Sequence, residues 1–246
     1  MKPITLEICC PDILSYEAAI EGGADRVELC TGLAEGGMTP SDGMIRQAVA
    51  MPGKPKIHVL IRPRAGDFCY GEREIRIMLD DISRCRDLGV DGVVVGGLNE
   101  DSTIDVETSR RLIRQAEGMA VTYHRAFDVC RNPEEAFRII TDLGANRLLT
   151  SGGAPKAIEA LGQLARLVEL SPEGFSVIAA SGVNPQNLET ILRETGLREA
   201  HASASDLVEV PLRYFATDKL TNEYDSRRSS AAIVRQLSTI TRNFSR

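Results

Sequence analysis

Short apolar runs alternate with helix-like segments eight times along this sequence, and this alternation limits the possible folds more than any other feature. Each run has the length of a strand buried on both faces, and longer segments suited to helices separate the runs. Parallel strands need a crossover connection, which is usually a helix. The alternation therefore predicts an α/β chain with eight parallel strands. We expect them at Ile4–Cys9, Arg26–Cys30, Ile57–Arg62, Asp91–Gly97, Ala120–His124, Asn146–Thr150, Phe175–Ala180 and Glu199–Ser203.

A weak internal repeat favours a closed barrel over an open sheet. At Gly23, Gly89 and Gly144, a helix-ending glycine precedes an apolar residue, then Asp or Asn, then a strand, and Gly196 begins a looser copy. Glycine is the usual residue just past a helix C-terminus. The copies precede every second strand, a regularity that fits a barrel better than a sheet with one switch point. We predict a single (β/α)8 TIM-barrel domain over residues 1–246.

Composition restricts the type of protein. A net charge of −6 argues against a nucleic-acid binder. No apolar stretch approaches the roughly 20 residues that a membrane-spanning helix needs, and the N-terminus lacks a signal-peptide core, so we expect a cytoplasmic protein without membrane partners. The six cysteines contain no CxxC pair, and disulfides are rare in that compartment. Before the last helix, residues 205–225 look irregular.

Polar side chains gather at the C-terminal ends of the predicted strands. Residues two apart on a strand share a face, so Glu7 lies with Cys9, and Glu28 lies with Cys30 on the next strand. The third strand stops near Pro63, which cannot donate to a sheet. In a barrel these strand ends meet at one mouth, where active sites lie. Further candidates at the mouth are Arg62, Arg64, His124, Arg125, Asp128 and His201.

These residues allow a structural and a functional interpretation. In the structural one, Glu7, Glu28, Arg62 and Arg125 form an ion-paired plug inside the barrel, because a buried acid needs a cationic or hydrogen-bonding partner. In the functional one, Arg62 and Arg64 receive an anionic ligand while His124 or a glutamate moves protons. The spacing of His124 and Asp128 suggests an acid–base pair in that pocket.

Two small-residue turns suggest a phosphate site. Ser151-Gly152 and Ser181-Gly182 each follow a strand and precede a predicted helix, the second of which we expect to begin at Asn184-Pro185. Backbone amides at such helix N-termini can form anion-binding nests. Small residues are equally suited to a tight connection without any ligand.

A third interpretation is a metal site. The thiols of Cys9 and Cys30 fall on neighbouring strands, close enough to hold a soft ion. Two thiolates with no further fixed ligands suit Cu(I) better than tetrahedral zinc.

Several motifs resemble the CutC family. The resemblance runs in order from residue 4 to about residue 205, and its most specific segments are Arg62-Pro63-Arg64-Ala65-Gly66-Asp67-Phe68 and His124-Arg125-Ala126-Phe127-Asp128. It implies a cytoplasmic TIM barrel, often a homodimer, named for copper homeostasis, with a Cu(I) site at the positions of Cys9 and Cys30. The alternative is an enzyme or binding protein for a small anionic metabolite, phosphorylated or not, at the barrel mouth.

Overall fold

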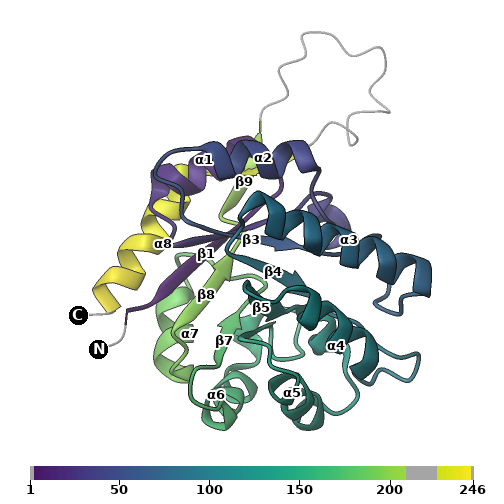
Figure 1. The fold of residues 1–246 in the computed structure, drawn as a ribbon. Helices are drawn as coiled ribbons and strands as arrows, with labels where there is room; N and C mark the ends of the chain where they lie inside the picture. Colours follow the sequence, from purple (N-terminus) through teal and green to yellow (C-terminus); the bar gives the residue numbers. More distant parts are fainter. Residues whose placement is uncertain (1–2, 209–225, 245–246) are drawn as a thin grey trace, which may run out of the picture.

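The computed structural model describes residues 3–208 and 226–244, in which eight parallel strands form a closed barrel (Figure 1). Each strand pairs with the next one along the chain, and β8 pairs back onto β1. The predicted TIM barrel is therefore confirmed. The strands are β1 (Thr5–Cys10), β2 (Arg26–Leu29), β3 (Lys56–Leu60), β4 (Gly92–Val95), β5 (Ala120–Tyr123), β6 (Arg147–Thr150), β7 (Ser176–Ala179) and β8 (Glu199–Ala202).

Helices cover the outside of the barrel (Figure 1). Several begin at a side-chain cap, as at Asp12, whose carboxylate accepts from the Ser15 amide. Within the described ranges, no helix is both long and apolar enough to cross a membrane. The helices are α1 (Ile13–Gly22), α2 (Asp42–Ala50), α3 (Glu72–Leu88), α4 (Val106–Gln115), α5 (Pro133–Asp142), α6 (Leu161–Leu170), α7 (Leu188–Thr195) and α8 (Ala231–Phe244), with short 3-10 turns η1 (Leu33–Glu35), η2 (Arg125–Val129) and η3 (Ala157–Glu159).

Alternation along the strands divides the buried residues into two sets. On β1, Leu6 and Ile8 belong to the main core with helix residues such as Tyr16. Cys9, one position further on, belongs instead to a small apolar cluster inside the barrel. The interior of the barrel therefore holds Cys9 and Cys30, whereas Cys10 lies in the core between the barrel and its helices.

The first and last elements of the chain lie side by side where β1 pairs with β8. The α8 helix lies beside α1 (Figure 1), and the approach is so tight that a Cβ on Gly22 would lie 2.4 Å from Val234 Cβ. A short antiparallel ribbon of β9 (Ser205–Val208) and β10 (Ser226–Ser229) follows β8. It is fixed to the barrel by Ser229, whose hydroxyl donates to the carbonyl of Ser203.

Two local expectations are wrong, and a third is wrong in part. The helix expected at Asn184-Pro185 begins at Leu188, because the side chains of Asn184 and Asn187 accept from nearby amides and hold a non-helical turn. After Gly153, η3 intervenes before α6 begins. The segment expected to be irregular contains β9, and its remainder, 209–225, lies outside the described residues.

Candidate functional site

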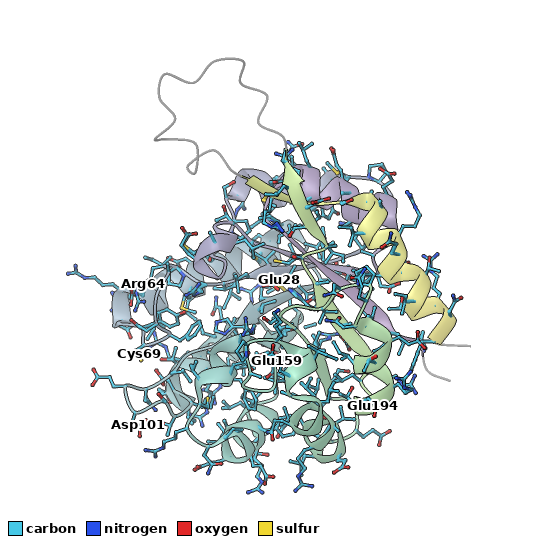
Figure 2. The ribbon with its side chains drawn as sticks, turned by 180° about the vertical axis from the view of Figure 1, so that it is seen from behind. Glu28, Arg64, Cys69, Asp101, Glu159 and Glu194 are labelled. Atoms are coloured by element: carbon cyan, nitrogen blue, oxygen red, sulfur yellow. The ribbon has the colours of Figure 1, made fainter. Side chains whose placement is uncertain are left out.

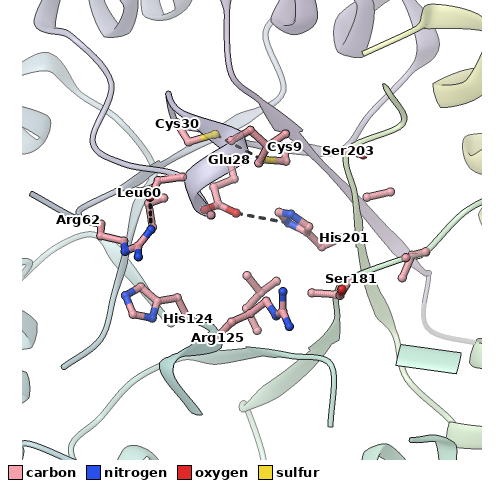
Figure 3. Close-up of a pocket in the computed structure, with 18 of the residues that line it drawn as sticks. Cys9, Glu28, Cys30, Leu60, Arg62, His124, Arg125, Ser181, His201 and Ser203 are labelled. Carbon is pink, nitrogen blue, oxygen red and sulfur yellow. Dashed lines mark hydrogen bonds and ion pairs between the residues drawn. The ribbon is translucent and has the colours of Figure 1, made fainter. Parts of the chain in front are cut away.

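A cavity of about 320 Å³ opens at the C-terminal ends of the barrel strands (Figure 3). It brings together most of the residues expected at the mouth, from β1, β2 and β8 and from the turns after β2, β3, β5 and β7. The expected residues that line it are Cys9, Glu28, Cys30, Arg62, His124, Arg125, Ser181, Gly182 and His201. Those outside its lining are Glu7, Arg64, Asp128, Ser151 and Gly152.

The two expected thiols face each other on one wall of the cavity. Cys9, the last residue but one of β1, lies opposite Glu28, and Cys30 follows β2, so that the two Sγ atoms lie 3.4 Å apart. Both residues are buried. The hydrogen bond to Cys30, together with burial, raises the pKa of Cys9 well above its ordinary value. Cys9 is therefore a protonated thiol at neutral pH.

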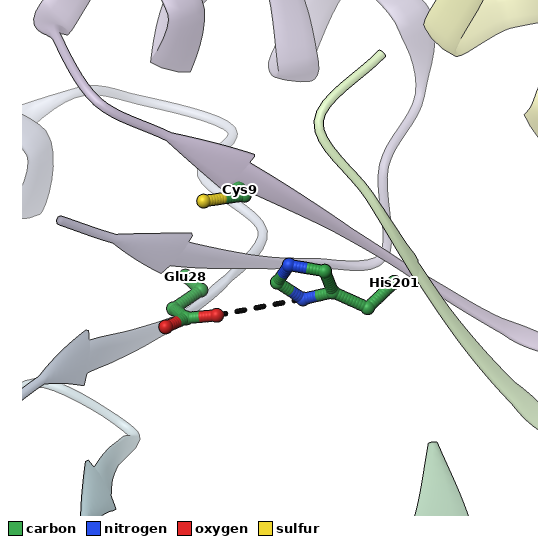
Figure 4. Close-up of side chains that lie close together, drawn as sticks. All are labelled: Cys9, Glu28 and His201. Carbon is green, nitrogen blue, oxygen red and sulfur yellow. Dashed lines mark ion pairs between the residues drawn. The ribbon is translucent and has the colours of Figure 1, made fainter. Parts of the chain in front are cut away.

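Cys9 also lies in a cluster of three different donor types (Figure 4). One ligand atom each from Cys9, Glu28 and His201 lie within 4.8 Å of one another. The imidazole Nδ1 of His201 is 3.5 Å from a carboxylate oxygen of Glu28. Burial raises the pKa of Glu28 to about 7, so this carboxyl changes its charge near neutral pH. The cluster can thus offer sulfur, oxygen and nitrogen donors to one ligand.

A buried ionic network lies behind this cluster in the barrel interior. Arg26 forms ion pairs with both Glu7 and Glu199, and Glu199 is also 3.5 Å from Arg147. The second carboxylate oxygen of Glu7 lies 2.7 Å from Nδ1 of His201. Burial opposes ionisation of Glu7, but Arg26 and His201 outweigh it and hold the pKa of Glu7 below its ordinary value.

The ion-paired plug therefore exists, but its cations differ from those expected. Arg26 pairs with Glu7 and Glu199, and Arg147 lies near Glu199, whereas the ion pair of Glu28 is with His201 and the acids contact neither Arg62 nor Arg125. A signal for Arg26 was present in the sequence, because it stands two positions before Glu28 and so shares its face. Glu199 stands two positions before His201, and Arg147 stands two before Leu149, so alternation would also have placed both side chains on the interior face of their strands.

Arg62 lies across the cavity from His201 (Figure 3). Its guanidinium donates to the backbone carbonyls of Glu35, Gly37 and Gly66 at 2.7–2.8 Å. The ring of Phe68 lies 5.0 Å from the guanidinium carbon, within the range of a cation–π contact. Arg62 thus fixes two loops around the mouth while it remains buried.

His124 lies beside Arg62 as a neutral imidazole. Its Nδ1 accepts from the Ala126 amide at 3.1 Å. Burial and the positive charge of Arg62 lower the pKa of His124 to about 3. The ring occupies space that a side chain at Gly96 would fill, since a Cβ there would lie 2.4 Å from Cε1 of His124. The absence of a side chain at Gly96 therefore leaves room for the His124 ring.

Asp128 is not the hydrogen-bonding partner of His124 that we expected. Its carboxylate accepts from the amide and hydroxyl of Ser151, from the hydroxyl of Thr150 and from the Gly153 amide. Arg125 completes the group with an ion pair of 2.7 Å. Of the amides predicted to bind phosphate, that of Ser151 thus donates to the Asp128 carboxylate and that of Gly152 donates to the Thr150 hydroxyl.

The second predicted phosphate turn and Arg64 also differ from expectation. Ser181 and Gly182 reach the cavity, but α7 begins only at Leu188, so their amides are not at a helix N-terminus. Arg64 is held by Asp67 and Glu74 away from the cavity. Figure 2 shows it at the margin of the molecule, whereas Glu28 lies near the middle.

Comparisons with known proteins agree with one another. The model of the CutC family matches residues 4–206. Proteins named as CutC family proteins include one from Bacteroides thetaiotaomicron, 44% identical over 87% of this chain and 86% of its own, and one from Caulobacter vibrioides, 45% identical over 81% of each.

Solved structures give the same result. A structure of CutC from Streptococcus agalactiae, named for copper homeostasis, has a TM-score of 0.77 and 32% identity, covering 81% of this chain and 98% of that one. Thiamine phosphate pyrophosphorylase from Pyrococcus furiosus has a TM-score of 0.60 at 15% identity, covering 98% of this chain and 96% of its own, and so shares the fold alone.

Proposed function

This chain belongs to the CutC family, and from that premise we propose that it serves copper homeostasis by binding Cu(I) through Cys9 and Cys30. The observation that carries the proposal is the 3.4 Å approach of the two buried Sγ atoms. Soft thiolates are preferred ligands of Cu(I). The residues present therefore fit a Cu(I) ion.

The surroundings of the thiols support the same proposal. Thiols bind metals as thiolates, so binding at Cys9 must displace its proton. Glu28 and His201 lie beside Cys9 and can accept that proton or supply a further ligand atom. The apolar neighbours Leu60 and Val94 keep water from the pair, an environment that suits a soft ion.

An anaerobic Cu(I) titration against a competing chelator tests this function. We expect the wild type to hold one Cu(I), and Cys9→Ser or Cys30→Ser to weaken binding by more than about 100-fold, beyond the range of outer-shell changes. Cys10→Ser is the matched control, because Cys10 is the next residue but belongs to the core outside the barrel interior. Equal Cu(I) affinity in the folded Cys9→Ser/Cys30→Ser double variant contradicts the proposal.

The family resemblance further leads us to propose a homodimer. Sedimentation velocity at several protein concentrations tests it, and a single species of monomer mass throughout contradicts it.

A further inference from the structure

The cavity wall that carries Arg62 and His124 has the character of a second ligand site (Figure 3). We propose that Arg62 binds the carboxylate of a small organic acid in this cavity, with the carbon skeleton of the acid against the apolar lining. Arg62 and the two proposed Cu(I) ligands, Cys9 and Cys30, line the same cavity, but the acid binds through Arg62 and does not depend on copper.

The charge of Arg62 is the first argument. Arg62 is 4% exposed, and its three recorded hydrogen bonds end on backbone carbonyls, which carry no net charge. Among residues 3–208 and 226–244, no Asp or Glu oxygen lies within 4.0 Å of its guanidinium, whereas Arg26, Arg64 and Arg125 each have an acidic partner. A buried cation without a counter-ion is costly, and a bound anion reduces that cost.

His124 supplies a second, neutral donor on the same wall. Because Nδ1 accepts from the Ala126 amide, the proton of the neutral ring is on Nε2. This buried nitrogen has no hydrogen-bond partner in the described part of the chain. Buried donors are nearly always paired, so an orphaned one beside an unneutralised cation indicates a missing acceptor. A carboxylate oxygen satisfies both groups.

The shape and lining of the cavity indicate what else the ligand contains. Side chains of Leu33, Leu60, Leu149 and Val183 line it, so a carbon skeleton is accommodated without desolvating polar groups. On the far side Glu28 and His201 can bind a hydroxyl or amino substituent. At about 320 Å³ the cavity has the size of a small-molecule site.

A carboxylate fits this site better than a phosphate. A phosphate dianion requires several donors and more positive charge. In the described part of the chain, Arg62 is the one arginine lining the cavity without an acidic partner, and the amides of Ser151 and Gly153 after β6 already donate to Asp128. A singly charged carboxylate is matched by Arg62 alone.

Thermal-shift measurements followed by calorimetry on the copper-free full chain test the proposal. The probes are lactate, pyruvate, malate, succinate, glycerol 3-phosphate and inorganic phosphate at millimolar concentration. We expect at least one carboxylate to raise Tm and the two phosphates to have no effect. No response to any carboxylate overturns the proposal, and a response to the phosphates alone overturns its ligand class.

Variants then locate the site. Arg62→Met should weaken acid binding by about 10- to 100-fold, the range for a hydrogen-bonded charge. Because Arg62 also holds two loops, Ala180→Leu provides a second test: it keeps the guanidinium and fills the cavity that Ala180 lines. Arg64→Met is the matched control, since Arg64 is paired outside the cavity.

Undiminished affinity in folded Arg62→Met, or in Ala180→Leu, overturns the proposal. Acid binding should persist in Cys9→Ser/Cys30→Ser, which separates this site from the one proposed for Cu(I). Loss of acid binding in that folded double variant overturns the claim that the two sites are independent.

Discussion

Two glycines on β4 and just after it make room for the imidazoles of the barrel interior. A Cβ on Gly92 would lie 2.6 Å from Nε2 of His58, and one on Gly96 would lie 2.4 Å from Cε1 of His124. Neither glycine has a positive φ, so space rather than backbone conformation requires glycine here. The positions of both histidines therefore depend on residues that carry no functional group.

Gly96→Ala should destabilise the protein and displace His124. The added methyl group overlaps the buried ring of His124, and such overpacking costs about 1–3 kcal/mol. Gly97→Ala is the matched control, since its nearest neighbour would be 3.6 Å away, and its effect should stay within about 0.5 kcal/mol. Urea unfolding measures both. Equal stability of the two variants contradicts the assignment.

His58 should make the folded state sensitive to acid. Burial, reinforced by Arg26 and Arg147, lowers the pKa of His58 to about 3, against about 6.5 in the unfolded chain. Between these values the unfolded state binds a proton that the folded state does not, so stability falls as pH falls from about 6.5 towards 3. The contribution of this histidine is about 1 kcal/mol per pH unit in that window.

Unfolding free energies of wild type and His58→Gln at several pH values test this expectation. The variant should lose stability less steeply on acidification, by about 1 kcal/mol per pH unit. Parallel curves for the two proteins would show that the imidazole is not held neutral by the fold.

At the scale of the element, periodicity predicted all eight barrel strands. It failed where side chains compete with the backbone for hydrogen bonds, as at Asn184 and Asn187 before α7. The loop after β6 is a similar case, because Asp128 reaches it from a different turn and occupies its amides. A local sequence pattern does not show that a side chain distant in the sequence will accept a hydrogen bond from that loop.

The candidate site was predicted in the same uneven way. Alternation along single strands was enough to direct Glu28, Arg62 and His124 to one mouth. It could not say which cation neutralises which acid, because that depends on the register between strands. Glu7 lies opposite Arg26 across β1 and β2, while Glu199 reaches the same guanidinium from β8, 173 residues away.

At the scale of the whole molecule, Arg26 joins the two ends of the barrel sheet. Arg26→Met leaves the carboxylates of Glu7 and Glu199 buried without it, and removing one partner of a buried ion pair costs about 3–5 kcal/mol. Arg46→Met is the control, since its pair with Asp42 is exposed and is worth no more than about 1 kcal/mol. Urea midpoints at neutral pH compare them, and similar losses in both variants contradict a structural role for the network.

Because β1 pairs with β8, the site can be complete only after β8 has been synthesised. Cys9 and Cys30 leave the ribosome early, whereas Glu199 and His201 are among the last barrel residues to emerge. N-terminal segments are available first while translation proceeds. A nascent chain thus exposes both sulfur atoms to the cell long before the imidazole arrives beside them.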